Sequence, residues 1–404
     1  MVNGRVGRIN GEAGRDCTKI SSPPLGAERE LRSKLVHLGW PGDAVGAIMA
    51  YNRRRSVAKG VAMKIGVFDH LDKRAEPLGQ FYEDRLAFTR SLDEAGFYSY
   101  HIAEHHATPL GMAPSPNVYL AAVARETKQL RFGPLVYLLP LYHPVRLIEE
   151  IAMIDNLSQG RLDMGVGRGI SPYEVGSYDI DPVDTREMFA EGLDLLLKGL
   201  TSDRLDHQGK WYRVNDVPLE LHPVQKPFPP LWYGAGNESG ALVAARYGMH
   251  FVTLGDDGRC KNLIARYREM WEEAKDDPHR ATAPAEPMIG VGRHLFLADT
   301  DAEAERLAAQ AYKHWYDALA KLWRDHGANP VTGMMIENYA DARRGGQCII
   351  GTPETVRTEL IAQIADVGYN YLVCQIAWGD LGHTREMRSL QLFVDEVMPA
   401  IAAL

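Results

Sequence analysis

The sequence predicts a single (β/α)8 barrel, an α/β fold, with insertions after the fourth and seventh strands. From residue 63 onward, short β-branched or apolar runs alternate with longer amphipathic stretches, which is the pattern of parallel βαβ units. About 340 residues carry this pattern, and a barrel needs roughly 250 residues plus its insertions. The runner-up is an open doubly wound sheet. That fold favours a GxGxxG turn after an early strand, whereas here the first strand runs into Asp69-His70-Leu71.

Residues 1–62 differ from the rest of the chain. They are rich in Gly, Arg and Ser and show no sustained period of 2 or 3.6 residues. We therefore expect residues 1–62 to be a mostly disordered N-terminal extension and residues 63–404 to be the barrel domain. Met63 is a candidate for the true initiation site.

Eight runs after residue 63 have the composition of buried strands, and helical periods lie between them. The first is Lys64-Ile65-Gly66-Val67-Phe68, where the regular pattern begins. The predicted strands are 64–68, 98–102, 131–138, 161–166, 231–235, 249–254, 288–297 and 369–376.

Two segments exceed a normal barrel connection. Residues 203–230 end in a proline-rich stretch, and we expect a hairpin followed by a rigid lead into the fifth strand. Residues 326–350 contain four glycines and are expected to form a mobile excursion late in the barrel. Long loops on a rigid scaffold are usually functional or disordered, so this second segment is interpreted as a lid.

The composition excludes several classes of protein. The first 62 residues carry 11 Lys and Arg against 5 Asp and Glu, a net +6, so the total of −8 leaves −14 on residues 63–404. A domain that acidic is a poor general binder of nucleic acid. No apolar run approaches the roughly 18 residues needed to cross a bilayer, so no membrane association is expected.

The four cysteines, Cys17, Cys260, Cys348 and Cys374, lack metal-site spacing and are too few for a disulfide framework. We expect a reducing, cytoplasmic setting.

The second predicted strand ends in Glu104-His105-His106. Side chains alternate along a strand, so two adjacent histidines cannot both face the barrel axis. A hydrolase-type metal site in a barrel needs His-x-His, and we expect no metal here. Taken alone, the motif is also compatible with polar residues that cap a loop through hydrogen bonds.

The fourth predicted strand leads into a glycine-rich segment that contains Gly165, Gly167, Arg168 and Gly169. The glycines are expected to remove side chains where the strand meets its loop, so that a large planar ligand can approach the backbone. Arg168 supplies a permanent cation between glycines, and an anionic partner explains it best.

After the fifth predicted strand, a turn of small residues from Gly234 to Gly240 leads into a helical pattern. Free N–H groups and the dipole at a helix N-terminus favour a phosphate. The alternative is an ordinary N-cap by Asn237 or Ser239. With Arg168, such a helix end would anchor a phosphorylated cofactor through charge-assisted hydrogen bonds of roughly 1.5–3 kcal/mol each.

With these segments in place, the chain from residue 63 to its end resembles the bacterial-luciferase-like family of flavin-dependent monooxygenases. Several motifs occur in the family's order over about 340 residues. The matching pieces are Ala103-Glu104-His105-His106, Leu139-Pro140, His143-Pro144-Val145-Arg146, Leu157-Ser158-Gln159-Gly160-Arg161, Gly165-Val166-Gly167-Arg168-Gly169, Ala235-Gly236-Asn237, Gly351-Thr352-Pro353-Glu354, Arg388-Ser389-Leu390 and Val397-Met398-Pro399.

The resemblance implies roles for individual residues. Glu104 resembles the position that contacts the flavin ring, and His105 resembles the catalytic histidine that assists the oxygen chemistry. Related enzymes hold a non-proline cis peptide under the flavin ring, and the alignment places it between Leu135 and Val136. Arg168, beside Gly169, resembles the arginine that grips the FMN phosphate.

The same resemblance places Gly236, Asn237 and Gly240 where the phosphate meets the helix N-terminus. Luciferase has acidic and hydroxyl side chains there, so in this chain backbone N–H groups would carry more of the phosphate, and a deazaflavin stays an alternative to FMN. Gly167 stands where luciferase has a reactive cysteine, so light emission is not expected.

The resemblance further implies a monooxygenase that uses reduced FMN from a separate NAD(P)H:flavin reductase and molecular oxygen to oxygenate a small organic substrate. The cofactor carries the hard chemistry, and the protein supplies a dry pocket and hydrogen bonds. We expect a homodimer. Two alternatives stay open: a deazaflavin-dependent dehydrogenase or reductase of the same fold, and a flavin-binding protein without turnover. The identity of the substrate does not follow from these motifs.

Overall fold

The computed structural model describes residues 63–330 and 335–404. Their centre is a parallel sheet whose neighbouring strands follow the order β3-β2-β1-β12-β10-β9-β8-β5-β4. Its strands are β1 (Lys64–Asp69), β2 (Ser99–Ile102), β3 (Arg131–Pro134), β4 (Tyr137–Leu138), β5 (Met164–Gly167), β8 (Leu231–Gly234), β9 (His250–Thr253), β10 (Ile289–Leu297) and β12 (Tyr371–Gln375). Because β3 and β4 are successive pieces of one strand and both meet the β5 segment, the sheet closes into a barrel.

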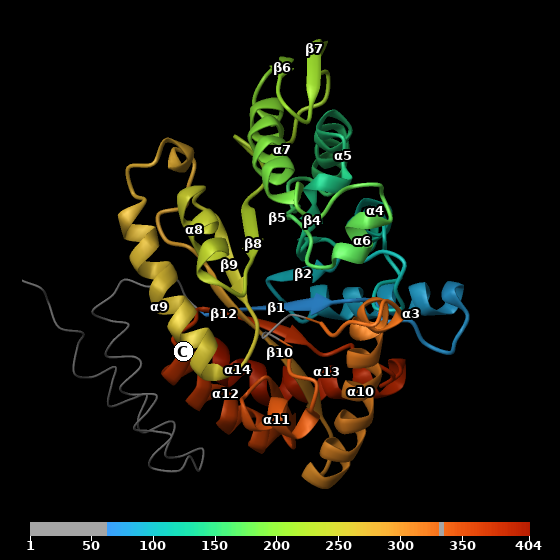
Figure 1. The fold of residues 1–404 in the computed structure, drawn as a ribbon. Helices are drawn as coiled ribbons and strands as arrows, with labels where there is room; N and C mark the ends of the chain where they lie inside the picture. Colours follow the sequence, from blue (N-terminus) through green and yellow to red (C-terminus); the bar gives the residue numbers. More distant parts are fainter. Residues whose placement is uncertain (1–62, 331–334) are drawn as a thin grey trace, which may run out of the picture. The chain divides into compact units, whose positions relative to one another are not determined.

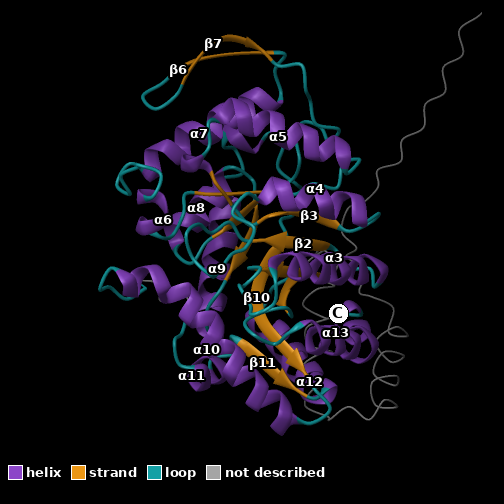
Figure 2. Cartoon of the chain, turned by 90° about the vertical axis from the view of Figure 1, so that its right-hand side faces the viewer, coloured by secondary structure: helices purple, strands orange, loops and turns teal. Residues whose placement is uncertain are grey.

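Helices lie outside these strands in Figures 1 and 2. The longer ones are α3 (Leu78–Glu94), α4 (Pro116–Glu126), α5 (Pro144–Leu157), α7 (Thr185–Leu200), α8 (Glu238–Arg246), α9 (Asp257–Glu273), α10 (Asp301–Asp325), α12 (Pro353–Val367) and α13 (His383–Leu392). The short ones are α6 (Pro172–Gly176), α11 (Tyr339–Arg344) and α14 (Met398–Ala402), with η1 (Leu139–Leu141), η2 (Pro278–Arg280) and η3 (Phe393–Val397). Side-chain caps mark several starts: the Thr352 hydroxyl, for example, accepts from the Thr355 N–H at the start of α12.

The interior of the barrel is filled by side chains from facing strands. One buried cluster there consists of Phe68, Ala103, Trp232, Val252, Met288, Tyr371 and Val373. Gly66 faces the same space, because a Cβ at this position would lie 1.9 Å from the Tyr371 hydroxyl. The barrel is therefore a packed core, and a site for a ligand has to lie at its mouth.

All eight predicted strands are confirmed, with boundaries that differ by a few residues. The third consists of two pieces, β3 and β4, and the peptide bond between Leu135 and Val136 is cis, at the position that the resemblance implied. The insertion after the fourth strand is confirmed as well. It holds an antiparallel hairpin of β6 (Arg204–Gln208) and β7 (Arg213–Pro218), at the top of Figure 2.

The segment 326–350 is more regular than the sequence analysis expected. It contains α11 and leads into β11 (Cys348–Gly351), a strand that was not predicted. β10 has nine residues: its first part pairs with β9 and β12, and its last four residues, from His294 to Leu297, pair with β11. β11 thus pairs with the part of β10 that extends beyond its pairing with β9, and the local sequence around Cys348 does not reveal this contact.

Some predictions fall on residues that are not described. The expected disorder of residues 1–62 lies outside the described residues, as does part of the expected lid, at 331–334. Among the helices of the remaining chain, none is long and apolar enough to span a membrane.

Candidate active site

The motif at the end of β2 divides between two sides of the strand. His105 turns toward His70, with ring centroids 5.8 Å apart, in a stacked arrangement. His106 turns to Glu104, whose carboxylate lies 2.9 Å from its Nε2. The alternation of side chains along a strand therefore separates the two histidines.

Glu104 is buried and its carboxylate is fully engaged by the protein. Oε2 accepts hydrogen bonds from the backbone N–H of Leu138 at 3.0 Å and from the Tyr142 hydroxyl at 2.9 Å, while Oε1 faces His106. Burial raises the pKa of Glu104, against the opposing effect of these hydrogen bonds. Glu104 thus ties the backbone of β4 to the end of β2.

His105 is held by a second carboxylate, that of Glu174 in α6. Its Nδ1 lies 3.1 Å from Glu174 Oε1, and the other carboxylate oxygen accepts from the His106 backbone N–H at 2.9 Å. Burial acts to lower the pKa of His105, but the charge and hydrogen bond of Glu174 outweigh it and raise that pKa above its ordinary value. Nδ1 therefore carries a proton toward Glu174, and Nε2 is the ring nitrogen available for chemistry.

A third contact extends the network to the surface. The hydroxyl of the exposed Tyr178 lies 2.7 Å from His106 Nδ1. Since His106 Nε2 faces Glu104, a neutral His106 donates from Nε2 and accepts from Tyr178. Tyr178, His106 and Glu104 thus form one hydrogen-bonded chain.

A different set of groups lies where β5 and β8 end. Arg168 follows β5 directly, and Arg186 is in the first turn of α7, one turn before Phe189, whose ring packs against Tyr233 of β8 at 5.8 Å. Burial raises the pKa of Tyr233, and the positive charges of Arg168 and Arg186 act in the opposite direction. In the described part of the chain, neither arginine has a carboxylate partner.

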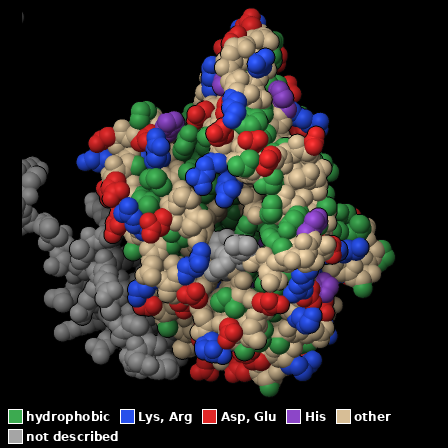
Figure 3. Space-filling view, in the orientation of Figure 1, with side chains coloured by type: hydrophobic (Ala, Val, Ile, Leu, Met, Phe, Trp, Pro, Cys, Tyr) green, Lys and Arg blue, Asp and Glu red, His purple; other side chains and the backbone are tan. Residues whose placement is uncertain are grey.

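Figure 3 shows Lys and Arg side chains gathered beside a hollow in the middle of this face. Two guanidinium groups near one tyrosine, without a carboxylate partner among the described residues, form a cluster that favours an anion.

The turn after β8 ends in an N-cap. The Asn237 carboxamide oxygen accepts from the Gly240 N–H at 3.0 Å and from the Ser239 hydroxyl at 2.8 Å. The N-cap alternative is therefore what the structure shows for Asn237, and the Gly240 N–H is not free. The N–H groups of Glu238 and Ser239 have no acceptor among the described residues and stay available to a ligand. The Gly236 carbonyl accepts from Arg259 of α9.

The glycines around Arg168 have a different purpose from the one expected. A Cβ at Gly165 would lie 2.2 Å from the Pro134 carbonyl oxygen, and one at Gly167 would lie 2.3 Å from Val136 Cγ2. These glycines let the two chain segments approach each other; they do not open space for a ligand, because the Pro134 carbonyl and the Val136 side chain fill it. Gly169 has φ +90°, a conformation that favours glycine.

Open space lies instead on β8, at Gly234. A Cβ there would meet nothing within 4 Å. Leu135 and Val136 are both half-buried at the same end of the barrel, and Leu135 packs on the interior cluster. The mouth thus combines an apolar floor with the arginine cluster.

Three residues of this site were missed in the sequence: Glu174, Tyr178 and Arg186. Ser171 and Glu174 have capping-box spacing, which announces a short helix but not its contact with His105. Arg186 and Tyr178 carry no local signal, because only the packing of α6 and α7 brings them to the mouth.

The fold and this site define a class: a barrel with a histidine–carboxylate pair and two arginines near the C-terminal ends of its strands, where barrel enzymes carry their active sites. The chain belongs to the luciferase-like monooxygenase family, whose model matches residues 63–371. It is therefore a flavin-dependent oxidoreductase of luciferase-like type.

Two individual relatives are similar to most of this chain. An uncharacterized protein of Sinorhizobium fredii is 35% identical over 84% of this chain and 97% of its own length. The oxygenase component of the flavin-dependent trigonelline monooxygenase of Acinetobacter baylyi is 26% identical over 84% of this chain and 96% of its own.

Among solved structures, the oxygenating constituent of 3,6-diketocamphane monooxygenase of Pseudomonas putida, in complex with FMN, is 24% identical, with a TM-score of 0.71. The match covers 84% of this chain and 98% of that one. At this identity the likeness shows the fold alone.

Proposed function

We propose that this protein is the oxygenase component of a two-component monooxygenase that uses reduced FMN and molecular oxygen on a small organic substrate. A separate NAD(P)H:flavin reductase supplies the reduced FMN. The related trigonelline enzyme is named as an oxygenase component, which supports this division of labour.

The observation that carries the proposal is the cluster of hydrogen-bond donors at the barrel mouth. Arg168 and Arg186 lack carboxylate partners in the described chain, and the N–H groups of Glu238 and Ser239 lack acceptors. A phosphate monoester is a near-dianion at neutral pH, so it satisfies two guanidinium groups and a helix N-terminus together. FMN fits this donor set, and its ring has the apolar Leu135 and Val136 to lie against.

Reduced FMN, when bound, supplies the two electrons with which one atom of O₂ enters the substrate and the other leaves as water. His105 contributes a proton site: Glu174 fixes the proton on Nδ1, so that Nε2 points away from the carboxylate and exchanges a proton with the reacting oxygen. Glu104 accepts a hydrogen bond from the backbone N–H of Leu138 in β4. This contact fixes the chain directly after Leu135 and Val136, which form the apolar floor.

The experiment has two arms. Titration of the purified protein with FMN, riboflavin and a deazaflavin, followed by flavin fluorescence, tests the cofactor; FMN is expected to bind more tightly than both. Oxygen uptake with NADH and a flavin reductase is then measured with and without candidate substrates. Substrate-dependent product formation supports the proposal. Preferential deazaflavin binding, or FMN binding without turnover on any substrate tried, contradicts it.

A further inference from the structure

A layer of polar side chains lies above the apolar cluster of the barrel interior. His294 of β10 and Gln375 of β12 are register partners on neighbouring parallel strands. Side chains alternate along each strand, so both share the face of Val373, a member of the interior cluster. His70 follows β1 two residues after Phe68, another member, and the two rings are 4.7 Å apart. We call His70, His294 and Gln375 the polar layer.

The polar layer retains hydrogen-bonding capacity that the described residues do not use. His294 is 1% exposed and Gln375 is 2% exposed. Within residues 63–330 and 335–404, three atoms of the polar layer have no hydrogen-bond partner: both ring nitrogens of His294 and Oε1 of Gln375. Buried polar groups are normally paired, and exceptions call for a specific cause such as a ligand.

His70, the third member of the polar layer, contributes a hydrogen-bond donor. His70 Nδ1 accepts from the indole N–H of Trp315 at 3.3 Å. A neutral His70 therefore carries its proton on Nε2, as a donor. Together the layer offers N–H donors from His70 and His294 and acceptors from His294 and Gln375.

The two histidines of the layer are uncharged near neutral pH. Burial, and after it the neighbouring His105, lowers the pKa of His70 well below its ordinary value. Burial, with the charge of Arg293, lowers the pKa of His294 to about 3. The layer therefore presents dipoles and no cation to a ligand.

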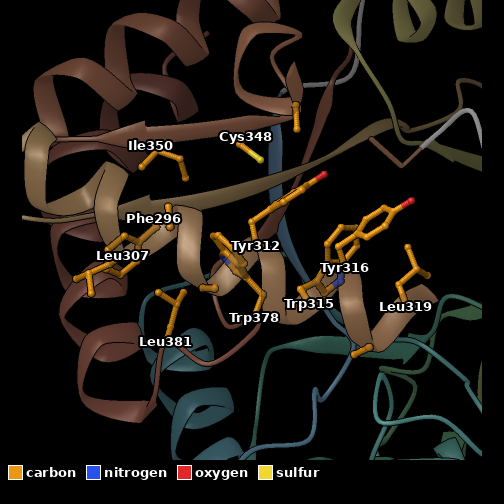
Figure 4. Close-up of a cluster of buried hydrophobic side chains, with 14 of the residues drawn as sticks. Phe296, Leu307, Tyr312, Trp315, Tyr316, Leu319, Cys348, Ile350, Trp378 and Leu381 are labelled. Atoms are coloured by element: carbon orange, nitrogen blue, oxygen red, sulfur yellow. The ribbon is translucent and has the colours of Figure 1, made fainter. Parts of the chain in front are cut away.

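An aromatic wall surrounds His294. The rings of Trp315, Trp378 and Tyr312 lie 4.4, 4.9 and 5.4 Å from its centroid, and Figure 4 shows them side by side. Their polar tips are already used: Trp378 Nε1 donates to the Leu295 carbonyl at 3.1 Å and the Tyr312 hydroxyl donates to the Ile336 carbonyl at 2.5 Å. The wall thus offers only apolar ring surface, next to the unpaired polar groups.

We propose that the polar layer binds the uncharged polar group of the organic substrate, a carbonyl or a hydroxyl, with His294 as its main partner. The substrate class is then a compact neutral ketone, aldehyde or alcohol with an apolar frame, and carboxylates are excluded. This inference rests on the proposed function for its location, since His70 stacks on His105 and so places the layer beside the proton site.

Four probes with the same ring separate the chemical alternatives: cyclohexanone, cyclohexanol, cyclohexanecarboxylate and methylcyclohexane. Binding to the full-length protein is measured by quenching of tryptophan fluorescence, because Trp315 and Trp378 touch His294, and by calorimetry. The ketone and the alcohol are expected to bind at least tenfold more tightly than the carboxylate and the hydrocarbon.

Variants assign the effect to the layer. His294→Phe is expected to weaken the ketone and the alcohol tenfold or more, because it removes both nitrogens. His294→Gln, which keeps a donor and an acceptor, should restore part of the affinity. Gln375→Leu serves as a second variant if His294→Phe does not fold, and His207→Phe, on the β6–β7 hairpin, is the matched control that should bind like the wild type.

Three results would overturn the inference: no binding of either neutral probe, equal binding of the carboxylate, or unchanged affinity in both layer variants. Each titration is run with and without FMN. If the protein binds cyclohexanone through His294 but does not bind FMN, the proposed function is contradicted and the inference about the polar layer is supported. If it binds FMN but not cyclohexanone, only the inference about the polar layer is contradicted.

Discussion

Replacing Arg168 by alanine tests whether the arginine cluster at the barrel mouth grips a phosphate. A charge-assisted hydrogen bond contributes about 1.5–3 kcal/mol, and because Arg168 is exposed and screened we take the lower end. A loss of about 1.5 kcal/mol corresponds to about tenfold in Kd. We expect this loss for FMN and none for riboflavin, which lacks the phosphate. Arg186→Ala should show the same selectivity.

The assay is a fluorescence titration of each variant with FMN and riboflavin, at low and at high salt. The difference between wild type and Arg168→Ala should shrink at high salt, because the interaction is between exposed charges. Arg204→Ala is the control, since Arg204 is an exposed arginine of the hairpin paired with Asp216. Equal weakening of FMN and riboflavin would refute the reasoning, and so would unchanged FMN affinity in both mouth variants.

Three further predictions concern the proton site and the strand packing. His105→Ala should keep FMN bound but slow product formation by about 10²–10⁴-fold. A steady-state rate equal to that of the wild type, at normal FMN affinity, would argue that His105 has only a structural role. Glu174→Gln should lower the pKa of His105, followed by histidine NMR. Because the folded pKa is raised, protonated His105 stabilises the fold below its ordinary pKa of about 6.5, and this contribution fades as pH rises through the folded value. The stability deficit of Glu174→Gln in urea should therefore be larger just below pH 6.5 than well above it, and a pH-independent deficit would contradict this. Gly167→Ala should destabilise the fold by about 1–3 kcal/mol, since its Cβ would lie 2.3 Å from Val136 Cγ2. Gly234→Ala is the control and should not destabilise the fold, because a Cβ there meets nothing within 4 Å. Equal urea midpoints for the two variants would refute the packing argument.

The sequence predicted the place of three candidate residues in the fold, because each of them follows a predicted strand. Glu104, His105 and Arg168 each follow a run of buried residues that predicts a strand, and in a parallel barrel all such ends meet at one mouth. The residues that lie beside them in the folded protein were not predictable. Glu174 and Arg186 belong to helices that cross the mouth after β5, and no sequence period encodes the distance of 3.1 Å from Glu174 to His105.

The polar layer illustrates the same limit more sharply. His294 sits in the middle of a predicted strand, and sequence alone suggests nothing about its two nitrogens. Whether they are paired depends on side chains that arrive from α10 and β12, and the aromatic neighbours Trp315 and Trp378 supply packing but no acceptor.

By itself the sequence determined the barrel, its eight strands and the hairpin insertion, because alternation of buried strands and amphipathic helices is a local pattern that a window of residues contains. It also determined the family, through motifs in a fixed order. Tertiary structure alone decided that β11 pairs with the end of β10, that Asn237 caps α8, and that Gly165 and Gly167 make room for a neighbouring strand. Each of these depends on which atoms from distant segments occupy a given space, and that is fixed only when the whole barrel closes.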